Sequence, residues 1–286
     1  MFSWNRVPRY YRPLTNNGDD ESIYFDGSVE NESVPSSPSR PRVQPPHRHK
    51  RPSFRQTWTR NVLLTLLANF LLAFHTSAFN SMTFVFLPTP RAPEGSRDGL
   101  FHFSGGLGLP SARVGLATAI IGVIGLPLQI FIYPEVQTRL GTLKSFRTFL
   151  PFSSVAYALM PFLVLIPRIP WMVWPSFTFI VGLQVISRTF ALPAAIILVN
   201  NCVSDPTVLG TVHGVAQSIT SGARTLGPFV GGWGLALGLR YNLIGGVWWF
   251  LALEALVGWF LLFYIYEGKG IQKKKAPVEQ EEENSR

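Results

Sequence analysis

Six long apolar runs constrain the fold of this chain more than any other feature, because each is long enough to cross a lipid bilayer. An α-helix of about 20 mostly apolar residues spans the hydrocarbon core of a membrane. The six runs cover about residues 61–87, 111–133, 148–167, 171–201, 208–238 and 243–266. Their apolar residues are continuous rather than alternating, and an open sheet edge cannot satisfy its backbone in lipid. The sequence therefore predicts an all-α, multi-pass membrane protein with six transmembrane helices.

Charged residues lie mostly outside these runs. They make up 14% of the 286 residues, against ~25% in soluble globular chains. We expect residues 1–57, rich in Ser, Pro, Asn and Arg, to form a disordered tail, residues 58–268 to form a helical bundle, and residues 269–286 to form a second charged tail. This distribution excludes an ordinary soluble enzyme. The isoelectric point near 10 does not imply a nucleic-acid partner, because the apolar runs explain the chain better than a basic patch would.

The distribution of Lys and Arg predicts the orientation in the membrane. Because the number of predicted spans is even, both tails lie on one side. That side, with the loop after the second span, holds 18 Lys and Arg residues against five on the other. The more basic side faces the cytoplasm, so the glycosylation sequon Asn31-Glu32-Ser33 is expected to stay unmodified. The sequence leaves open whether the membrane is the plasma or the vacuolar membrane.

Polar residues inside the spans are the candidate functional residues. A basic side chain at mid-helix costs about 2.5–3.5 kcal/mol on insertion scales, so it usually faces protein or a water-filled cavity. Arg188 and Gln184 share one face of the fourth span. This face is either the wall of a cavity or a structural element in which Arg188 hydrogen-bonds carbonyl oxygens of neighbouring helices.

The first and fifth spans each carry a polar stripe at helical spacing. Taken with the fourth span, these stripes predict a cavity wall made of Asn69, Thr76, Asn80, Gln184, Arg188, Gln217, Ser221 and Arg224. In the sixth span, Glu254 could carry a coupling proton, be protonated and merely tolerated, or pair with an arginine. His213 is a second candidate for proton coupling, or a packing residue.

Catalytic and metal-binding motifs are absent from the sequence. There is no His-Glu-x-x-His, no Gly-x-x-x-x-Gly-Lys-Ser/Thr and no Gly-x-Ser-x-Gly, and Cys202 is the single cysteine. We therefore predict neither an enzyme nor a metal site.

The fifth span contains the sequence Gly227-Pro228-Phe229-Val230-Gly231-Gly232. It resembles the Gly-x-x-x-Gly-Pro-x-x-Gly-Gly element in the eleventh helix of major facilitator superfamily transporters. The similarity is greatest to the fungal and plant branch of proton-coupled multidrug and zinc-induced-facilitator-like proteins. Ala223 replaces the first glycine of that element. The resemblance implies a packing or gating role for Gly227, Pro228, Gly231 and Gly232, since small residues let helices approach closely.

A second resemblance lies between the second and third spans, in residues 134–144. This segment is similar to the cytoplasmic Gly-x-x-x-Asp-Arg-x-x-Gly-Arg loop of the same family. Arg139 and Gly141 match the pattern and are implied gating residues. Thr138 stands where the family has an acidic residue.

The resemblance implies that the chain forms one half of a major facilitator fold, with helices corresponding to seven to twelve. It implies transport of a small organic solute or drug, driven by a proton gradient and without another cofactor. The implied partners are the bilayer, the substrate and a second six-helix half, on the same chain if the gene is longer or on another chain otherwise. The alternative is a truncated or degenerate half-transporter without transport activity of its own.

Overall fold

The computed structural model describes residues 57–93, 101–167, 169–203 and 205–268. The predicted tails, residues 1–56 and 269–286, lie outside this part of the chain. Within the described residues, the regular structure is helical, and the β-type pairings are two isolated bridges, Arg91–Gly105 and Phe103–Leu243.

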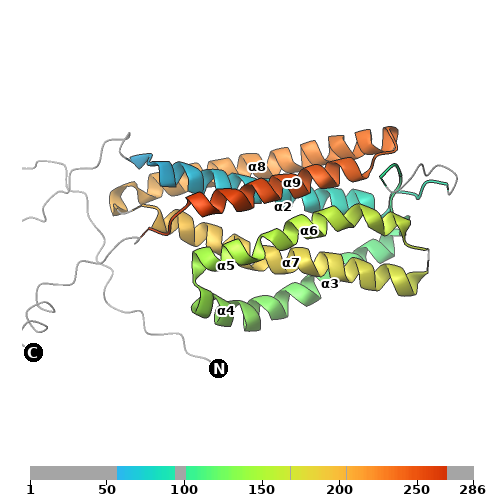
Figure 1. The fold of residues 1–286 in the computed structure, drawn as a ribbon, viewed down its shortest axis with the longest axis horizontal. Coiled ribbons are helices and arrows are strands. Elements are labelled where there is room, and N and C mark those ends of the chain that lie inside the picture. Colours follow the sequence, from blue (N-terminus) through green and yellow to red (C-terminus); the bar gives the residue numbers. More distant parts are fainter. Residues whose placement is uncertain (1–56, 94–100, 168, 204, 269–286) are drawn as a thin grey trace, which may run out of the picture. The chain divides into compact units, whose positions relative to one another are not determined.

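The helices follow the order of the apolar runs (Figure 1). The first run forms α2 (Arg60–Phe86). The second forms α3 (Ser111–Pro127), a π-helical segment (Leu128–Ile132) and α4 (Tyr133–Leu140). The third forms α5 (Thr142–Phe149), α6 (Pro151–Leu159) and a 3-10 segment (Met160–Leu165). The last three form α7 (Pro170–Asn201), α8 (Pro206–Arg240), and α9 (Gly245–Leu261) with a 3-10 segment (Leu262–Tyr264).

Five of these helical segments are long and apolar enough to cross a membrane: Arg60–Phe86, Ser111–Leu140, Thr142–Leu165, Trp171–Asn201 and Gly245–Tyr264. The prediction of an all-α, multi-pass membrane protein is confirmed. The fifth predicted span is α8, which has 35 residues but is not among these five. Its glycines, hydroxyls and amides make it less apolar than its neighbours while leaving it long enough to span.

The junction between the second and third predicted spans is shorter than a loop. Helical structure continues to Leu140 and resumes at Thr142, so Gly141 alone separates α4 from α5. Gly141 has a φ of 76°, in the left-handed region that glycine adopts without steric cost. The segment that resembles the family loop is therefore a sharp joint between two helices.

Buried aromatic side chains join α2, α6 and α9. The Phe79 ring lies 5.0 Å from the Tyr157 ring and 5.9 Å from the Trp248 ring, and the Phe86 ring lies 5.5 Å from that of Trp248. All four side chains are fully buried. These rings anchor α2, whose most extensive contact runs along α8 (Figure 1).

The segment Ser111–Leu140 is the least covered of the bundle. Ala117 is the one buried residue in α3, and the other residues of the segment are exposed or half-buried. Its outer surface is therefore available to lipid or to another protein segment.

Candidate functional site

The first polar hollow lies between α2, α7 and α8 and has a volume of about 280 Å³. Its polar wall consists of Asn69 from α2 and His213, Gln217, Thr220 and Arg224 from α8. Its apolar wall includes Leu72 from α2 and Leu192, Ile196 and Val199 from α7. The α8 side chains reach one hollow because positions 213, 217, 220 and 224 repeat at steps of four, three and four.

Hydrogen bonds between helices hold part of this wall in place. Asn69 Nδ2 donates to Thr220 Oγ1 at 3.0 Å, and the Thr220 hydroxyl donates to the Ala216 carbonyl at 2.8 Å. His213 Nε2 donates to Oδ1 of Asn200 on α7. The polar stripe of α8 is thus fixed against both α2 and α7.

A second hollow of about 240 Å³ lies between α3 and α7. Arg188, Thr189 and Gln129 provide its polar side chains, and Leu192 borders both hollows. The two spaces therefore lie on adjoining sides of α7. Each is slightly smaller than the ~300–1,000 Å³ that is typical of small-ligand sites.

Neither arginine of the hollows is paired within the described part of the chain. Among the described residues, Arg188 and Arg224 have no hydrogen-bond or ion-pair partner, and the one salt bridge joins Arg139 to Glu135. Arg224 is exposed and Arg188 is partly exposed.

A separate polar cluster lies inside the bundle. His75 Nδ1 and the Tyr157 hydroxyl are hydrogen-bonded at 2.8 Å, and both side chains are buried. Gln184 lies beside Tyr157, and Glu254 and Arg188 lie within electrostatic reach of it. Both carboxylate oxygens of Glu254 are buried and have no hydrogen-bond partner within the described part of the chain.

The Gly-Pro-x-x-Gly-Gly segment presents two faces. Gly227 and Gly231 are buried against α2, where Ser77 and Met82 are their respective neighbours. Gly232 is exposed and has open space around its Cα. Pro228 supplies no backbone N–H, so the Arg224 carbonyl lacks its usual i→i−4 donor beside the first hollow.

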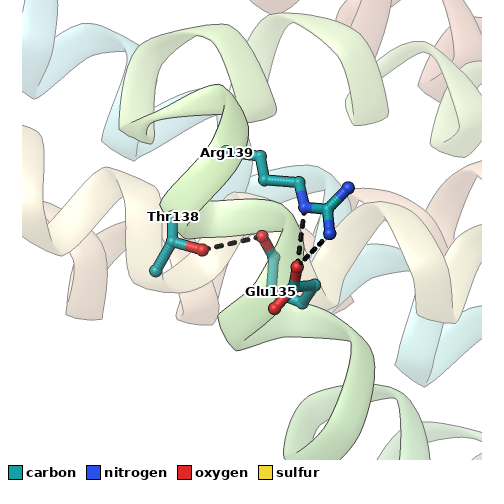
Figure 2. A network of polar contacts seen from close by, with 3 residues as sticks. All are labelled: Glu135, Thr138 and Arg139. Carbon is teal, nitrogen blue, oxygen red and sulfur yellow. Dashed lines mark hydrogen bonds and ion pairs between the residues drawn. The ribbon is translucent and has the colours of Figure 1, made fainter.

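Arg139 pairs with an acidic residue one helical turn earlier in α4. Arg139 Nη2 lies 2.5 Å and Nε 2.6 Å from Glu135 Oε1, and Thr138 Oγ1 donates to the Glu135 carbonyl at 2.9 Å (Figure 2). Glu135 thus neutralises the arginine although Thr138 replaces the acidic residue of the family pattern. Both charged side chains are well exposed, so this pair contributes little to stability.

The structure brings some of the predicted cavity residues together and separates others. Asn69, Gln217, Arg224 and His213 share the first hollow, and Arg188 lines the second. Gln184 is buried beside Tyr157, and Ser221 is exposed outside both hollows.

The other two predicted residues of α2 lie elsewhere. Thr76 is buried, and Asn80 borders a gap of about 10 Å³ near α3.

Sequence reasoning missed Tyr157 and Asn200. Tyrosine is enriched at the membrane interface, but Tyr157 occurs well inside an apolar run. This unusual position could have identified Tyr157 as a candidate functional residue. Asn200 gave no such signal, because it lies near the end of a span. In the described residues, no group of three or more His, Cys, Asp or Glu side chains could hold a metal ion.

Comparison with known proteins identifies a relative. No protein-family model and no solved structure matches the chain. The chain is 33% identical over 220 residues to the major facilitator superfamily multidrug transporter mfsB of Aspergillus fumigatus. The similar region covers 75% of this chain and 35% of that transporter, so the chain spans about a third of the relative's length. The similarity indicates homology to part of a multidrug transporter of the major facilitator superfamily, a family of transport proteins and not of enzymes.

Proposed function

We propose that this chain is part of a major facilitator transporter that moves a small organic solute or drug across a membrane. The observation that carries this proposal is the pair of adjoining hollows on α7. Each hollow is lined by an arginine that has no partner among the described residues, together with amide and hydroxyl side chains. Polar surface of this kind is costly in a membrane protein unless it faces water, substrate or another polar surface. The similarity to the Aspergillus multidrug transporter supports the same class of function.

The proposal includes a second six-helix half. In transporters of this fold, substrate is held between two halves near the midplane, and access alternates as one half rocks against the other. The exposed surfaces of α3 and α8 would meet the second half, on the same chain or on another. The joint at Gly141 would let α4 and α5 move relative to each other during gating. The contact of Gly227 and Gly231 with α2 would help α8 move.

Proton coupling is assigned to Glu254, with His213 as a second candidate. Glu254 is a buried carboxylate on α9, and both Glu254 and Arg188 lie within electrostatic reach of Tyr157. Protonation of Glu254 would change the electric field at Tyr157 and Arg188. A proton bound inside the bundle could in this way change the affinity of the second hollow for substrate.

The transport proposal is tested with the full chain reconstituted into vesicles. Uptake of radiolabelled anionic, neutral and cationic aromatic solutes is measured with and without a pH gradient. We expect gradient-dependent uptake that falls at least tenfold in Arg224→Gln and in Arg188→Gln. Glu254→Gln should retain binding but lose the dependence on the gradient. The matched control is Arg60→Gln, because Arg60 is exposed at the start of α2 and lines neither hollow.

A folded chain that transports no solute under any gradient would favour the alternative, a truncated or degenerate half without activity. Co-reconstitution with a six-helix amino-terminal half separates the two forms of that alternative, because a truncated half regains uptake and a degenerate half does not. A fluorescent fusion in fungal cells would distinguish the plasma from the vacuolar membrane.

A further inference from the structure

We propose that the two hollows bind an organic anion, a carboxylate or sulfonate attached to an apolar body. This inference rests on the proposed function, because it names the substrate class of the same site. It goes beyond the multidrug label of the relative, which specifies no charge.

The charge of the walls favours an anion. Among the described residues, the acidic side chains are Glu135, Asp205, Glu254 and Glu267, and none of them lines either hollow. Glu135 is paired with Arg139, and Asp205 caps the start of α8 by accepting from the Thr207 amide at 2.9 Å. Among the described residues, the walls of the hollows therefore hold two arginines and no carboxylate. An anion is attracted to such a site and a cation is repelled.

Arg188 and Arg224 differ from other arginines of the bundle in their hydrogen bonding. Arg147 donates to the Leu262 and Ile265 carbonyls at 2.8 and 2.9 Å, and Arg91 donates to the Ile166 carbonyl at 2.8 Å. These arginines hold helix ends and loops together. Arg188 and Arg224 make no such bonds to the described residues, so the carbonyl-bonded role considered for Arg188 from the sequence has no support in this structure. Their donors remain available for a ligand.

The side chains that line the hollows suit a molecule with an anionic group and an apolar body. A guanidinium group presents a planar fork of donors that fits a carboxylate or a sulfonate. Gln217 adds an amide donor to the hollow that contains Arg224, and Thr189 adds a hydroxyl to the hollow that contains Arg188. Leu192, Ile196 and Val199 provide apolar surface for the rest of the molecule.

The test measures binding to the purified full chain in phosphatidylcholine nanodiscs by equilibrium dialysis. The probes are three molecules of similar shape: naphthalene-2-carboxylate, naphthalene-2-carboxamide and naphthalen-2-ylmethylammonium. We expect the carboxylate to bind at least tenfold more tightly than the amide, and the ammonium more weakly than either. Arg224→Gln and Arg188→Gln should each weaken carboxylate binding at least tenfold, whereas Arg60→Gln, at an exposed position at the start of α2, should leave it unchanged.

Arg224→Lys controls for a loss of binding caused by misfolding. It keeps the positive charge but loses the planar set of guanidinium donors, so it should bind the carboxylate with intermediate affinity. Equal binding of the three probes would overturn the proposal. A preference for the ammonium probe would also overturn it, as would carboxylate binding that both glutamine variants retain.

A further arm distinguishes a soluble anion from a lipid headgroup. Phosphatidylserine is added to the nanodisc, and unchanged carboxylate affinity supports a soluble anion, whereas loss of carboxylate binding overturns the substrate assignment. Failure of this inference is separable from failure of transport. Uptake of a neutral or cationic solute that naphthalene-2-carboxylate does not inhibit would overturn the anion proposal and leave transport standing. Selective anion binding without any uptake would support the anion proposal and overturn the transport proposal.

Discussion

Gly227 on α8 lies directly against the backbone of Phe74 on α2, so that a Cβ added to Gly227 would come within 2.7 Å of the Phe74 carbonyl oxygen. The amide nitrogen of Ala78 would be 3.0 Å away. Backbone atoms cannot move aside without moving the helix. Close packing of α2 on α8 therefore requires glycine at this position.

Gly227→Ala is predicted to destabilise the bundle by about 1–3 kcal/mol, the usual cost of overpacking. Gly231→Ala should cost less, because its added Cβ would meet the flexible end of Met82, with Sδ at 3.0 Å. Thermal unfolding in detergent, followed by size-exclusion chromatography, measures the difference.

The matched control is Gly232→Ala, in the same motif. Nothing lies within 4 Å of a Cβ at this position, so alanine should be neutral or slightly stabilising through its higher helix propensity. Equal unfolding temperatures for the Gly227→Ala and Gly232→Ala variants would contradict the proposed packing of α2 on α8.

Tyr157→Phe is predicted to destabilise the bundle by about 1–3 kcal/mol, because it leaves His75 Nδ1 buried without its partner. Replacing both residues by phenylalanine should recover most of the loss, since no unpaired polar group then remains at this site. The same unfolding assay measures both effects. The control is Tyr264→Phe, an exposed tyrosine that should change stability by less than about 0.5 kcal/mol. If the double variant loses as much as the sum of the single variants, the two residues do not act as a pair.

Cys202 should react slowly with alkylating reagents at neutral pH. It follows the end of α7, and burial disfavours its charged thiolate, which raises the pKa of the thiol to about 11. The thiolate is the reactive form, so the rate of iodoacetamide labelling should rise about tenfold per pH unit from pH 7 to 10. A rate that levels off near pH 9, as for an exposed cysteine peptide measured alongside, would show an unshifted thiol. Because Cys202 is the single cysteine, no other site interferes.

The predicted orientation is testable with glycosylation. Asn31 lies on the side predicted to be cytoplasmic, so Asn31→Gln should not change the mobility of the protein expressed in a eukaryotic membrane. Glu94→Asn creates a sequon with Gly95 and Ser96 on the side predicted to be outside, and it should add a glycan. Modification at Asn31 and none after Glu94→Asn would reverse the orientation.

The apolar runs were sufficient to predict the helical, multi-pass fold, because a segment in lipid must satisfy its own backbone hydrogen bonds. The same logic located α7 closely, since Pro170 and Asn201 bound a continuous apolar run. The helical steps also placed Gln217 and Arg224 on one face of α8. The Gly-Pro-x-x-Gly-Gly pattern suggested a transporter relative, and the similarity to the Aspergillus protein agrees with it.

Tertiary structure alone decided which polar residues meet. Gln184 and Arg188 share a helix face, yet one is buried beside Tyr157 and the other lines a hollow. Helical periodicity gives the direction of a side chain relative to its own helix, but it does not specify which neighbouring helix covers that face. The packing of α2, α6, α7 and α8 decides that His75 pairs with Tyr157. It also decides that Arg188 and Arg224 have no partner among the described residues. That packing arises from close contacts between residues far apart in the chain, such as Gly227 and Phe74.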